Sequence, residues 1–219
     1  MVFSFFRAGD TDSLDQIDQE VAGMLSDCRH SLDLALTALI AGGDDIEALG
    51  EEIRATDARI NRAEENVRRD LIVHLAVRGT TDFGSTMASI LAVKKLERMG
   101  DQAKNVYDLA AEGVRFTNVP DADELRELGI EVSNRLGEAS ALLSEPTAEA
   151  VEPFVAACQA RMDDLDRRVN GLIHSDEPAR VAVPRAMYFR YLKRILANAA
   201  GAVEVLVQPA EPVDPDSDE

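Results

Sequence analysis

The acidic residues near the middle of the chain have the spacing of a site that binds metal or forms ion pairs. The stretch KKLERMGDQAKNV, residues 94–106, places Glu97, Asp101 and Asn105 at four-residue steps, with a glycine at Gly100. Side chains four residues apart lie one above the other on the same helix face. A glycine beside them removes side-chain bulk, so a neighbouring helix or an ion can approach closely.

A second helix places two more acids at positions that face its neighbours, so acids from two helices can line the seam, that is, the contact between them. Ile53, Ile60 and Val67 follow the spacing of a core-facing stripe, and Asp57 and Glu64 occupy the positions between them. Acids at such positions are costly unless their charge is compensated. Carboxylates that converge without a histidine favour a hard cation such as iron(III), manganese or magnesium. The alternative is that these acids are solvated or paired with arginine.

The chain repeats these patterns in its second half. The segment DARIN at 57–61 recurs as DRRVN at 166–170, and KKLERMGD at 94–101 corresponds to RYLKRILA at 190–197. A repeat of this kind indicates a duplicated three-helix unit.

The two copies differ in their acids. Asp166 and Asn170 are retained, but Lys193 and Ala197 stand where the first half has Glu97 and Asp101. The ammonium of Lys193 can take the place of a cation and pair with Asp166 or with Asp163. We therefore predict one half that binds metal and one half, around Asp166, Asn170 and Lys193, that is closed by an ion pair and binds none.

Six amphipathic helices must position these residues. Apolar periodicity and turn signals predict them at about 14–41, 46–77, 83–116, 122–144, 147–175 and 179–207. The fold class is all-α, with two tandem three-helix antiparallel bundles. The segment NVPDADE at 118–124 is the best internal boundary. The predicted units are residues 1–118, residues 119–207 and a disordered acidic tail at 208–219.

Composition limits the function classes. Among 219 residues, 41 acids stand against 23 bases and give a formal net charge of −18, which opposes binding to nucleic acid or to an anionic membrane. Seven arginines are interleaved with acids, so we expect solvated, ion-paired helix faces: Arg59, Arg62, Arg68, Arg69, Arg161, Arg167 and Arg168. The opening MVFSFFR has too few apolar residues for a signal peptide or a membrane span, and is expected to be a packed or frayed terminus rather than a membrane anchor.

The sequence shows no catalytic set. It has no G-x-S-x-G, no phosphate-binding glycine loop and no C-x-x-C. The other residues with chemical potential are expected to be structural. We predict packed or surface histidines, reduced core thiols and core-filling methionines: His30, His74, His174, Cys28, Cys158, Met24, Met87 and Met99.

These motifs resemble those of the PhoU family of phosphate-signalling regulators. The stretch LERMGDQAKNV is similar to the family signature L-E-R-I-G-D-x-A-x-N-I, and DARINRAE is similar to the pattern D-x-x-[IV]-[DN]-x-x-E. The duplicated three-helix layout of the family would cover Leu14 to Val207.

The resemblance implies a cytoplasmic, non-enzymatic regulator that links a phosphate ABC transporter to a phosphate-sensing histidine kinase. It would contact the membrane only through these partners, and whether it forms a homodimer stays open. The family binds metal clusters through acidic motifs, which match Glu97 and Asp101 here, together with Asp57, Asn61 and Glu64. The acid that usually follows Glu64 by four residues is Arg68 in this chain.

Three function classes therefore remain. The first is the regulator of phosphate uptake and signalling, which acts by docking its helical faces against an ATPase or a kinase. The second is a metal-storage or metal-buffering helical protein, whose seam carboxylates are the function. The third, an enzyme, has no nucleophile or acid/base pair to support it.

Overall fold

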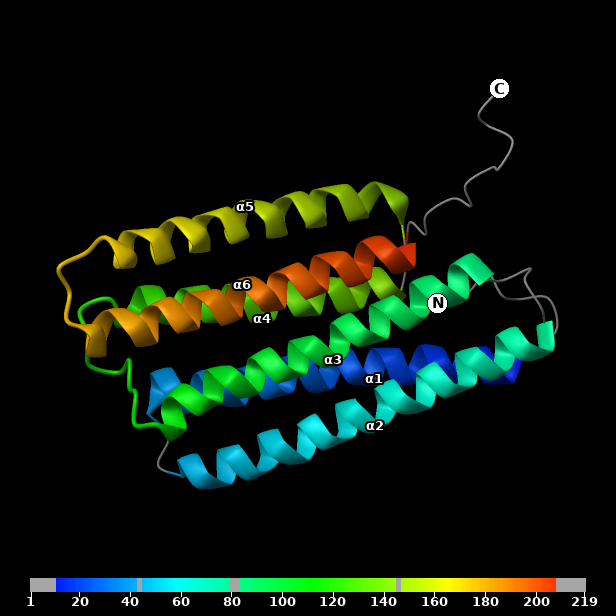
Figure 1. Ribbon diagram of the computed structural model, residues 1–219, viewed down its shortest axis with the longest axis horizontal. Coiled ribbons are helices and arrows are strands. Elements are labelled where there is room, and N and C mark those ends of the chain that lie inside the picture. The colour runs from blue at the N-terminus through cyan, green and yellow to red at the C-terminus, as the bar shows by residue number, and fades with distance from the viewer. Residues whose placement is uncertain (1–10, 43–44, 79–82, 145–146, 208–219) are drawn as a thin grey trace.

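In the part of the chain that the structure describes, six α-helices and one π-helical turn form an elongated antiparallel bundle (Figure 1). The computed structural model describes residues 11–42, 45–78, 83–144 and 147–207, and no β-strand occurs within these ranges. The elements are α1 (Thr11–Leu36), the π-helical turn η2 (Thr37–Ala41), α2 (Ile46–Arg78), α3 (Phe83–Ala111), α4 (Ala122–Ser144), α5 (Ala148–Ile173) and α6 (Ala179–Val207). The all-α prediction is confirmed. The predicted tail at 208–219 lies outside the described residues.

The two sets of three helices share one hydrophobic core. In Figure 1, α1, α2 and α3 lie together on one side and α4, α5 and α6 on the other. The packing between the sets runs mainly through α3 against α6 and through α1 against α4. Apolar residues from all six α-helices form one continuous buried cluster. The repeats are therefore held together by the same hydrophobic effect that folds each of them.

The helix predicted to end near 116 ends instead at Ala111. Gly113 adopts a positive φ of 86°, which glycine tolerates without strain, and the amide of Val114 donates to the carbonyl of Leu109 at 3.0 Å. Released from the helix, Phe116 is buried and meets the ring of Tyr188 edge-on, with centroids 5.6 Å apart. A helix terminator thus creates a contact between the halves.

The boundary predicted at 118–124 is joined to the last helix by an ion pair. Both oxygens of Asp121 accept hydrogen bonds from the buried guanidinium of Arg185, at 2.6 and 2.9 Å. The hydrogen bond from Arg185 lowers the pKa of Asp121, although burial opposes the effect. The Tyr188 hydroxyl donates to the carbonyl of Leu125 at 2.9 Å. The connection between the halves is therefore fixed to α6.

The predictions for the cysteines, histidines and methionines are confirmed except for Met87. Cys28 and Cys158 are free and buried, Met24 and Met99 are buried, and of the three histidines only His74 is packed in the interior. Met87 was expected in the core, but it is exposed on α3. No helix in the described ranges is long and apolar enough to span a membrane.

Candidate functional site

The predicted acids line the contact between α2 and α3, and we call Asp57, Glu64, Glu97 and Asp101 the acidic seam. Glu64 is buried, with 7% of its side chain exposed, and the exposed fractions of Glu97 and Asp57 are 15% and 17%. Asp101 lies at the edge of the seam with 43% exposed. Three of the four acids are therefore largely removed from water, as the core-facing spacing indicated.

A lysine joins two of these acids. The Nζ atom of Lys104 lies 3.0 Å from Oδ2 of Asp57 and 3.7 Å from Oδ1 of Asp101. Burial lowers the pKa of Lys104, but the hydrogen bond to Asp57 and the charges of both aspartates raise it overall. A cation already compensates this part of the seam, and it is the protein's own ammonium group.

The ionised form of Asp101 is disfavoured despite this lysine. Burial raises its pKa, and the charge of Glu97 raises it further, whereas Lys104 lowers it and Asp57 adds a smaller upward contribution. The net direction is upward, so burial together with the neighbouring acids outweighs the single ammonium.

The other two acids pair within their own helices. Oε2 of Glu97 lies 2.9 Å from Nζ of Lys94, and Nη1 of Arg68 donates to Oε1 of Glu64 at 3.1 Å. Arg68, the residue that departs from the family pattern, is thus the partner of Glu64. Asn61 on α2 and Asn105 on α3 are half-buried.

The arrangement does not fit a metal cluster. No three His, Cys, Asp or Glu side chains are placed to hold a metal ion in the part of the chain that the structure describes. The ammonium of Lys104 lies between Asp57 and Asp101, and the remaining acids turn to Lys94 and Arg68. The metal site therefore stays a prediction, and occupation of the seam by metal would require Lys104 to move.

The second half has the ion pair that the sequence predicted. Nζ of Lys193 on α6 lies 2.5 Å from Oδ2 of Asp166 on α5. Asp163 instead accepts a hydrogen bond from the amide of Gln159 at 2.7 Å, so Asp166 is the partner of the lysine. Asn170 is exposed, and its carbonyl accepts from the backbone of His174 at 3.3 Å.

Gly100 permits the close approach that its position indicated. A Cβ atom at Gly100 would lie 2.8 Å from Cδ1 of Ile60, which is 1% exposed in the core. The glycine of the third-helix motif and the isoleucine of the second-helix motif are therefore in direct contact. The two motifs form one packed unit of α2 and α3.

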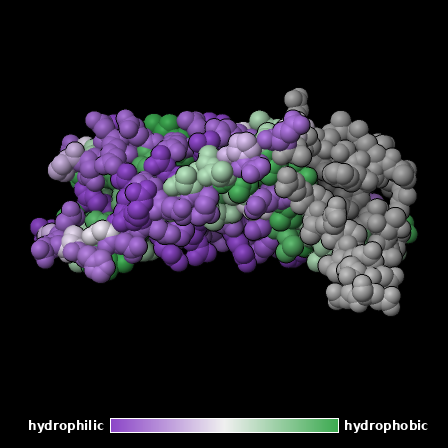
Figure 2. Space-filling view, turned by 90° about the horizontal axis from the view of Figure 1, so that it is seen from above, coloured by the Kyte–Doolittle hydropathy of each residue, from purple (hydrophilic) through white to green (hydrophobic). Residues whose placement is uncertain are grey.

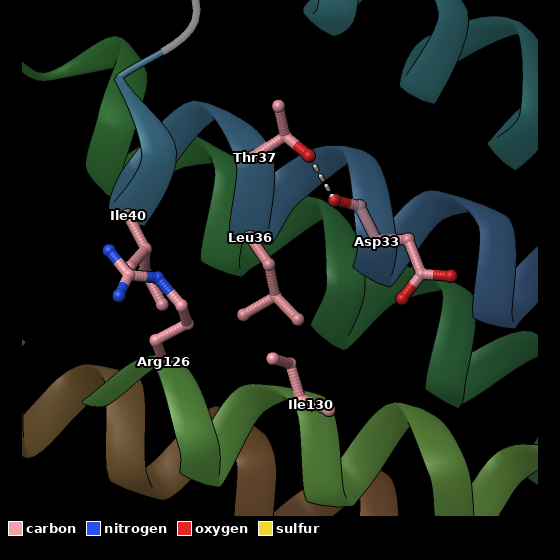
Figure 3. Close-up of a pocket in the computed structure, with 6 residues that line it drawn as sticks. All are labelled: Asp33, Leu36, Thr37, Ile40, Arg126 and Ile130. Atoms are coloured by element: carbon pink, nitrogen blue, oxygen red, sulfur yellow. Dashed lines mark hydrogen bonds between the residues drawn. The ribbon is translucent and has the colours of Figure 1, made fainter. Parts of the chain in front are cut away.

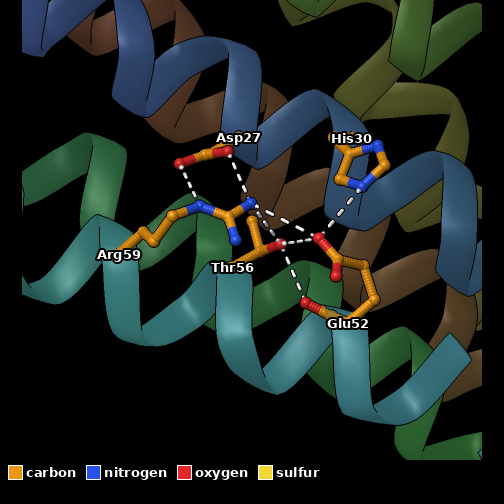
Figure 4. Close-up of polar contacts among 5 residues, drawn as sticks. All are labelled: Asp27, His30, Glu52, Thr56 and Arg59. Carbon is orange, nitrogen blue, oxygen red and sulfur yellow. Dashed lines mark hydrogen bonds and ion pairs between the residues drawn. The ribbon is translucent and has the colours of Figure 1, made fainter. Parts of the chain in front are cut away.

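An arginine of the second-helix motif ties α2 to α1 (Figure 4). The guanidinium of Arg59 donates to Asp27 at 3.1 and 3.3 Å and to the hydroxyl of Thr56 at 2.9 Å, and it lies 3.5 Å from Glu52. Nε2 of His30 lies 3.6 Å from the same oxygen of Glu52. The hydrogen bond to Asp27 raises the pKa of Arg59. This partner set joins residues far apart in the sequence, so the residue pattern had no signal for it.

The prediction of ion-paired arginine faces is confirmed for Arg59 and for four further arginines, whereas Arg69 donates to the side-chain oxygen of Asn66. Further arginines pair with acids, most of them through contacts of 2.6 to 3.2 Å: Arg68 with Glu64, Arg161 with Glu131 and Asp164, Arg167 with Asp164, and Arg168 with Asp164 and Glu124. The acids compensate the charges of these arginines, so the arginines do not form a basic patch.

A pocket that the sequence did not predict lies between the two halves (Figure 3). Its volume is about 260 Å³, and it is lined by side chains of α1, η2 and α4: Asp33, Leu36, Thr37, Ile40, Arg126 and Ile130. The Thr37 hydroxyl donates to the carbonyl of Asp33 at 2.8 Å, where the α-helix passes into the π-helical turn. The pocket wall is mainly apolar, with one acid and one arginine at its edge.

Comparison with known families identifies a domain over the seam. Residues 21–110 match the model of the PhoU domain, a range that contains both motifs and the whole acidic seam. This match confirms the resemblance that the motifs indicated. A sequence search among curated proteins finds no match to the chain.

Two solved structures share the fold over most of the chain. A PhoU structure from Pseudomonas aeruginosa has a TM-score of 0.71 and 21% identity, and the alignment covers 90% of this chain and 96% of that one. The phosphate transport system regulatory protein PhoU from Streptococcus pneumoniae has a TM-score of 0.74 and 18% identity, with coverage of 89% and 93%. The six-helix architecture is therefore that of PhoU structures.

Proposed function

We propose, from the premise that this chain carries a PhoU domain over residues 21–110, that the protein regulates phosphate transport and phosphate-responsive signalling. The domain match carries this proposal, because it contains the signature LERMGDQAKNV together with DARINRAE. The PhoU fold of two solved structures over about nine tenths of the chain supports it.

We further propose a cytoplasmic adaptor without enzymatic activity, whose partners are the ATPase of a phosphate ABC transporter and a phosphate-sensing histidine kinase. The charge of −18 favours protein partners over nucleic acid. Both thiols are poor nucleophiles, since burial raises the pKa of Cys158 to about 11 and that of Cys28 further still. Repression of uptake at high phosphate would then be relayed through docking of helical surfaces.

Deletion of the gene tests this function. Phosphate-responsive transcription and phosphate uptake are measured at high and low phosphate in the deletion strain and after complementation. We expect the deletion to leave both outputs high when phosphate is plentiful, and the wild-type gene to restore repression. An unaltered response to phosphate would refute the regulatory role.

A second candidate function is metal binding at the acidic seam, which the raised pKa of Asp101 favours. Burial and the charge of Glu97 destabilise its ionised form, and a bound cation would relieve that cost. We propose that iron, manganese or magnesium binds between Glu97, Asp101 and Asp57 when Lys104 is displaced. Oxygen ligands of this kind suit hard cations.

Metal content of variants tests the second candidate. Lys104→Met should increase bound metal, because the competing ammonium is removed, while Glu97→Gln or Asp101→Asn in that background should abolish the gain. Lys193→Met is the matched control in the second half and should bind none. Elemental analysis and calorimetry with each metal measure the result. Equal metal content in the Lys104→Met and Lys193→Met variants would eliminate the site.

A further inference from the structure

Another pocket lies at the end of the molecule where α6 begins. Its volume is about 280 Å³, and its walls come from the turn after α3 and from the first turns of α6. Three arginines line it, although acids outnumber bases by 41 to 23 in the chain: Arg115, Arg180 and Arg185. In Figure 2, this left-hand end of the molecule is mainly hydrophilic on the face shown. The pocket therefore gathers positive side chains in an acidic protein.

The turn after α3 holds the first of these arginines in place. Nη1 of Arg115 donates to the carbonyls of Ala110 and Val114, at 2.6 Å in each case. Carbonyls at the C-terminal end of a helix lack partners within the helix and favour a cation. Arg115 is half-buried, and its Nε and Nη2 groups have no acceptor among the residues that the structure describes. The guanidinium is thus fixed by one nitrogen, and the other two are available.

Arg185 forms a fixed wall of the pocket. Its Nε and Nη2 donate to Asp121, and its Nη1 donates to the carbonyl of Val181 at 3.3 Å. Its guanidinium carbon lies 5.8 Å from the centre of the Phe116 ring. Because Asp121 compensates its charge and all three nitrogens are engaged, Arg185 shapes the pocket but has little capacity left for a ligand.

Arg180 lies on the first turn of α6 and supplies the free charge. Its side chain is exposed, and it makes no hydrogen bond or ion pair within the described ranges. The N-terminal end of α6 adds a partial positive charge at the same place. Glu112 is the single acid among the described lining residues, and it is exposed and pairs with neither Arg115 nor Arg180. Two arginines of this pocket are therefore left without an acid.

We propose that this pocket binds a small organic anion through a phosphoryl or carboxylate group held by Arg115 and Arg180. The N–H groups of a guanidinium form a planar fork that matches the oxygens of either group. The pocket is larger than one such group, and valines and a proline make up much of its remaining wall, so the ligand would carry an organic body.

Other roles of the three arginines fit the structure less well. The pair with Asp121 accounts for Arg185, but no structural contact accounts for Arg180. A metal cation would be repelled by the arginines, and nucleic acid is disfavoured by the net charge of −18. The anion would join the two halves, because Arg115 follows α3 and Arg180 begins α6. This inference goes beyond the proposed function and does not depend on it.

Titration of the full chain with matched probes tests the proposal. Phenyl phosphate and benzoate carry the two candidate groups on the same ring, benzyl alcohol has the ring without a charge, and inorganic phosphate has the charge without a ring. Nuclear magnetic resonance follows the backbone amides of residues 112–119 and 179–185. Arg180→Gln is the main variant, because this side chain makes no contact on which folding depends.

Arg190→Gln on the same helix is the matched control, because Arg190 is also exposed but does not line the pocket. It lies about 15 Å along α6 from Arg180. The titrations are run at about 0.15 M salt, where the Debye length of about 8 Å screens charges at that separation.

We expect saturable shifts of these amides with phenyl phosphate or with benzoate, and the probe that binds identifies the group. Arg180→Gln should raise the dissociation constant about tenfold, a factor that one charge-assisted hydrogen bond supplies. Arg190→Gln should leave it unchanged. Glu112→Gln should lower it about twofold, because a like charge at the pocket is removed. Glu204→Gln, near the other end of α6, should have no effect.

Four results would each overturn the proposal. The first is that neither charged ring gives saturable shifts, and the second is that benzyl alcohol binds as tightly as they do. The third is equal weakening by Arg180→Gln and Arg190→Gln, which would show a general charge effect and no site. The fourth is binding of inorganic phosphate as tight as that of phenyl phosphate, which would exclude an organic ligand.

Discussion

The contact between α2 and α3 and the contact between α5 and α6 each contain an aspartate whose charge is compensated by a lysine, but the lysines come from different positions. Each begins with the aspartate of a repeated motif, Asp57 in the first half and Asp166 in the second, and each aspartate receives a lysine from the following helix. The lysines do not correspond. Lys193 occupies the position of Glu97, whereas Lys104 lies two helical turns further along α3.

Features that both halves share are distinguished in this way from those of the first half alone, and only the second group is available for a role other than helix packing. An aspartate paired with lysine is common to both halves, so it serves the contact between the second and third helix of each unit. Glu97 and Asp101 have no acidic counterpart in the second half, and they leave the first seam with excess negative charge around Asp101. Binding of a cation or a partner is therefore expected at the first seam alone.

The largest difference between the seams is expected from their apolar motif residues. Ile60 is buried against Gly100, while its counterpart Val169 is only partly buried. Ile60→Ala should lower the free energy of unfolding by about 2–5 kcal/mol, because it removes packed atoms and leaves a cavity. Val169→Ala should cost about 1 kcal/mol. Urea denaturation followed by circular dichroism measures both, and equal losses would show that the two motifs are packed alike.

Removal of the lysines should give the next largest difference. Lys104→Met leaves Asp57, with 17% of its side chain exposed, without its partner and removes a counter-charge from Asp101. We expect a loss of about 1–2 kcal/mol, between the values for surface and buried pairs, because a third of Lys104 is exposed.

Lys193→Met provides the comparison for that change. Asp166 is 46% exposed and can be solvated, so the loss of stability should stay below about 1 kcal/mol. Thermal and urea unfolding of both variants at low salt measure the pair of effects. A larger loss for Lys193→Met would mean that the second seam depends more on its ion pair than the first.

Much of this arrangement could be predicted from the sequence, because it follows from helical periodicity. The positions of Asp57 and Glu64 between apolar residues predicted partial burial, and the substitution at Lys193 predicted its ion pair with Asp166. The partner of Asp57 was missed. The signal was present, since Lys104 lies in the quoted stretch, but helix periodicity alone does not show which lysine of α3 faces α2.

The remaining errors arose where tertiary structure overrides local pattern. Met87 has core spacing but is exposed because α6 ends before reaching it. Phe116 was assigned to a helix, but the turn at Gly113 releases it to pack on Tyr188. The pocket at η2 depends on a π-helical turn facing α4, and no residue pattern in the sequence indicates that turn.

The smallest expected difference is in the sign of the pH dependence of stability. Burial, Glu97 and Asp57 raise the pKa of Asp101, and Lys104 opposes them, so its contribution to stability is fully present below its usual value near 3.8 and is lost as pH rises. Asp164 in the second half behaves oppositely. Hydrogen bonds from Arg168 and Arg161 and their charges lower its pKa against burial, so its contribution is present above that value and is lost as pH falls.

Two asparagine variants, one in each half, therefore test this difference in pH dependence. Relative to the wild type, the stability of Asp101→Asn should increase as pH rises from 3 to 7, because the variant no longer bears the cost of ionising this carboxyl group. The stability of Asp164→Asn should decrease over the same range, because the ionised partner of two arginines is lost. Urea unfolding at several pH values measures both slopes, and differences from wild type cancel the groups they share. Slopes of the same sign would mean that Asp101 is compensated as fully as Asp164, and that the first seam has no excess charge for a cation or a partner to neutralise.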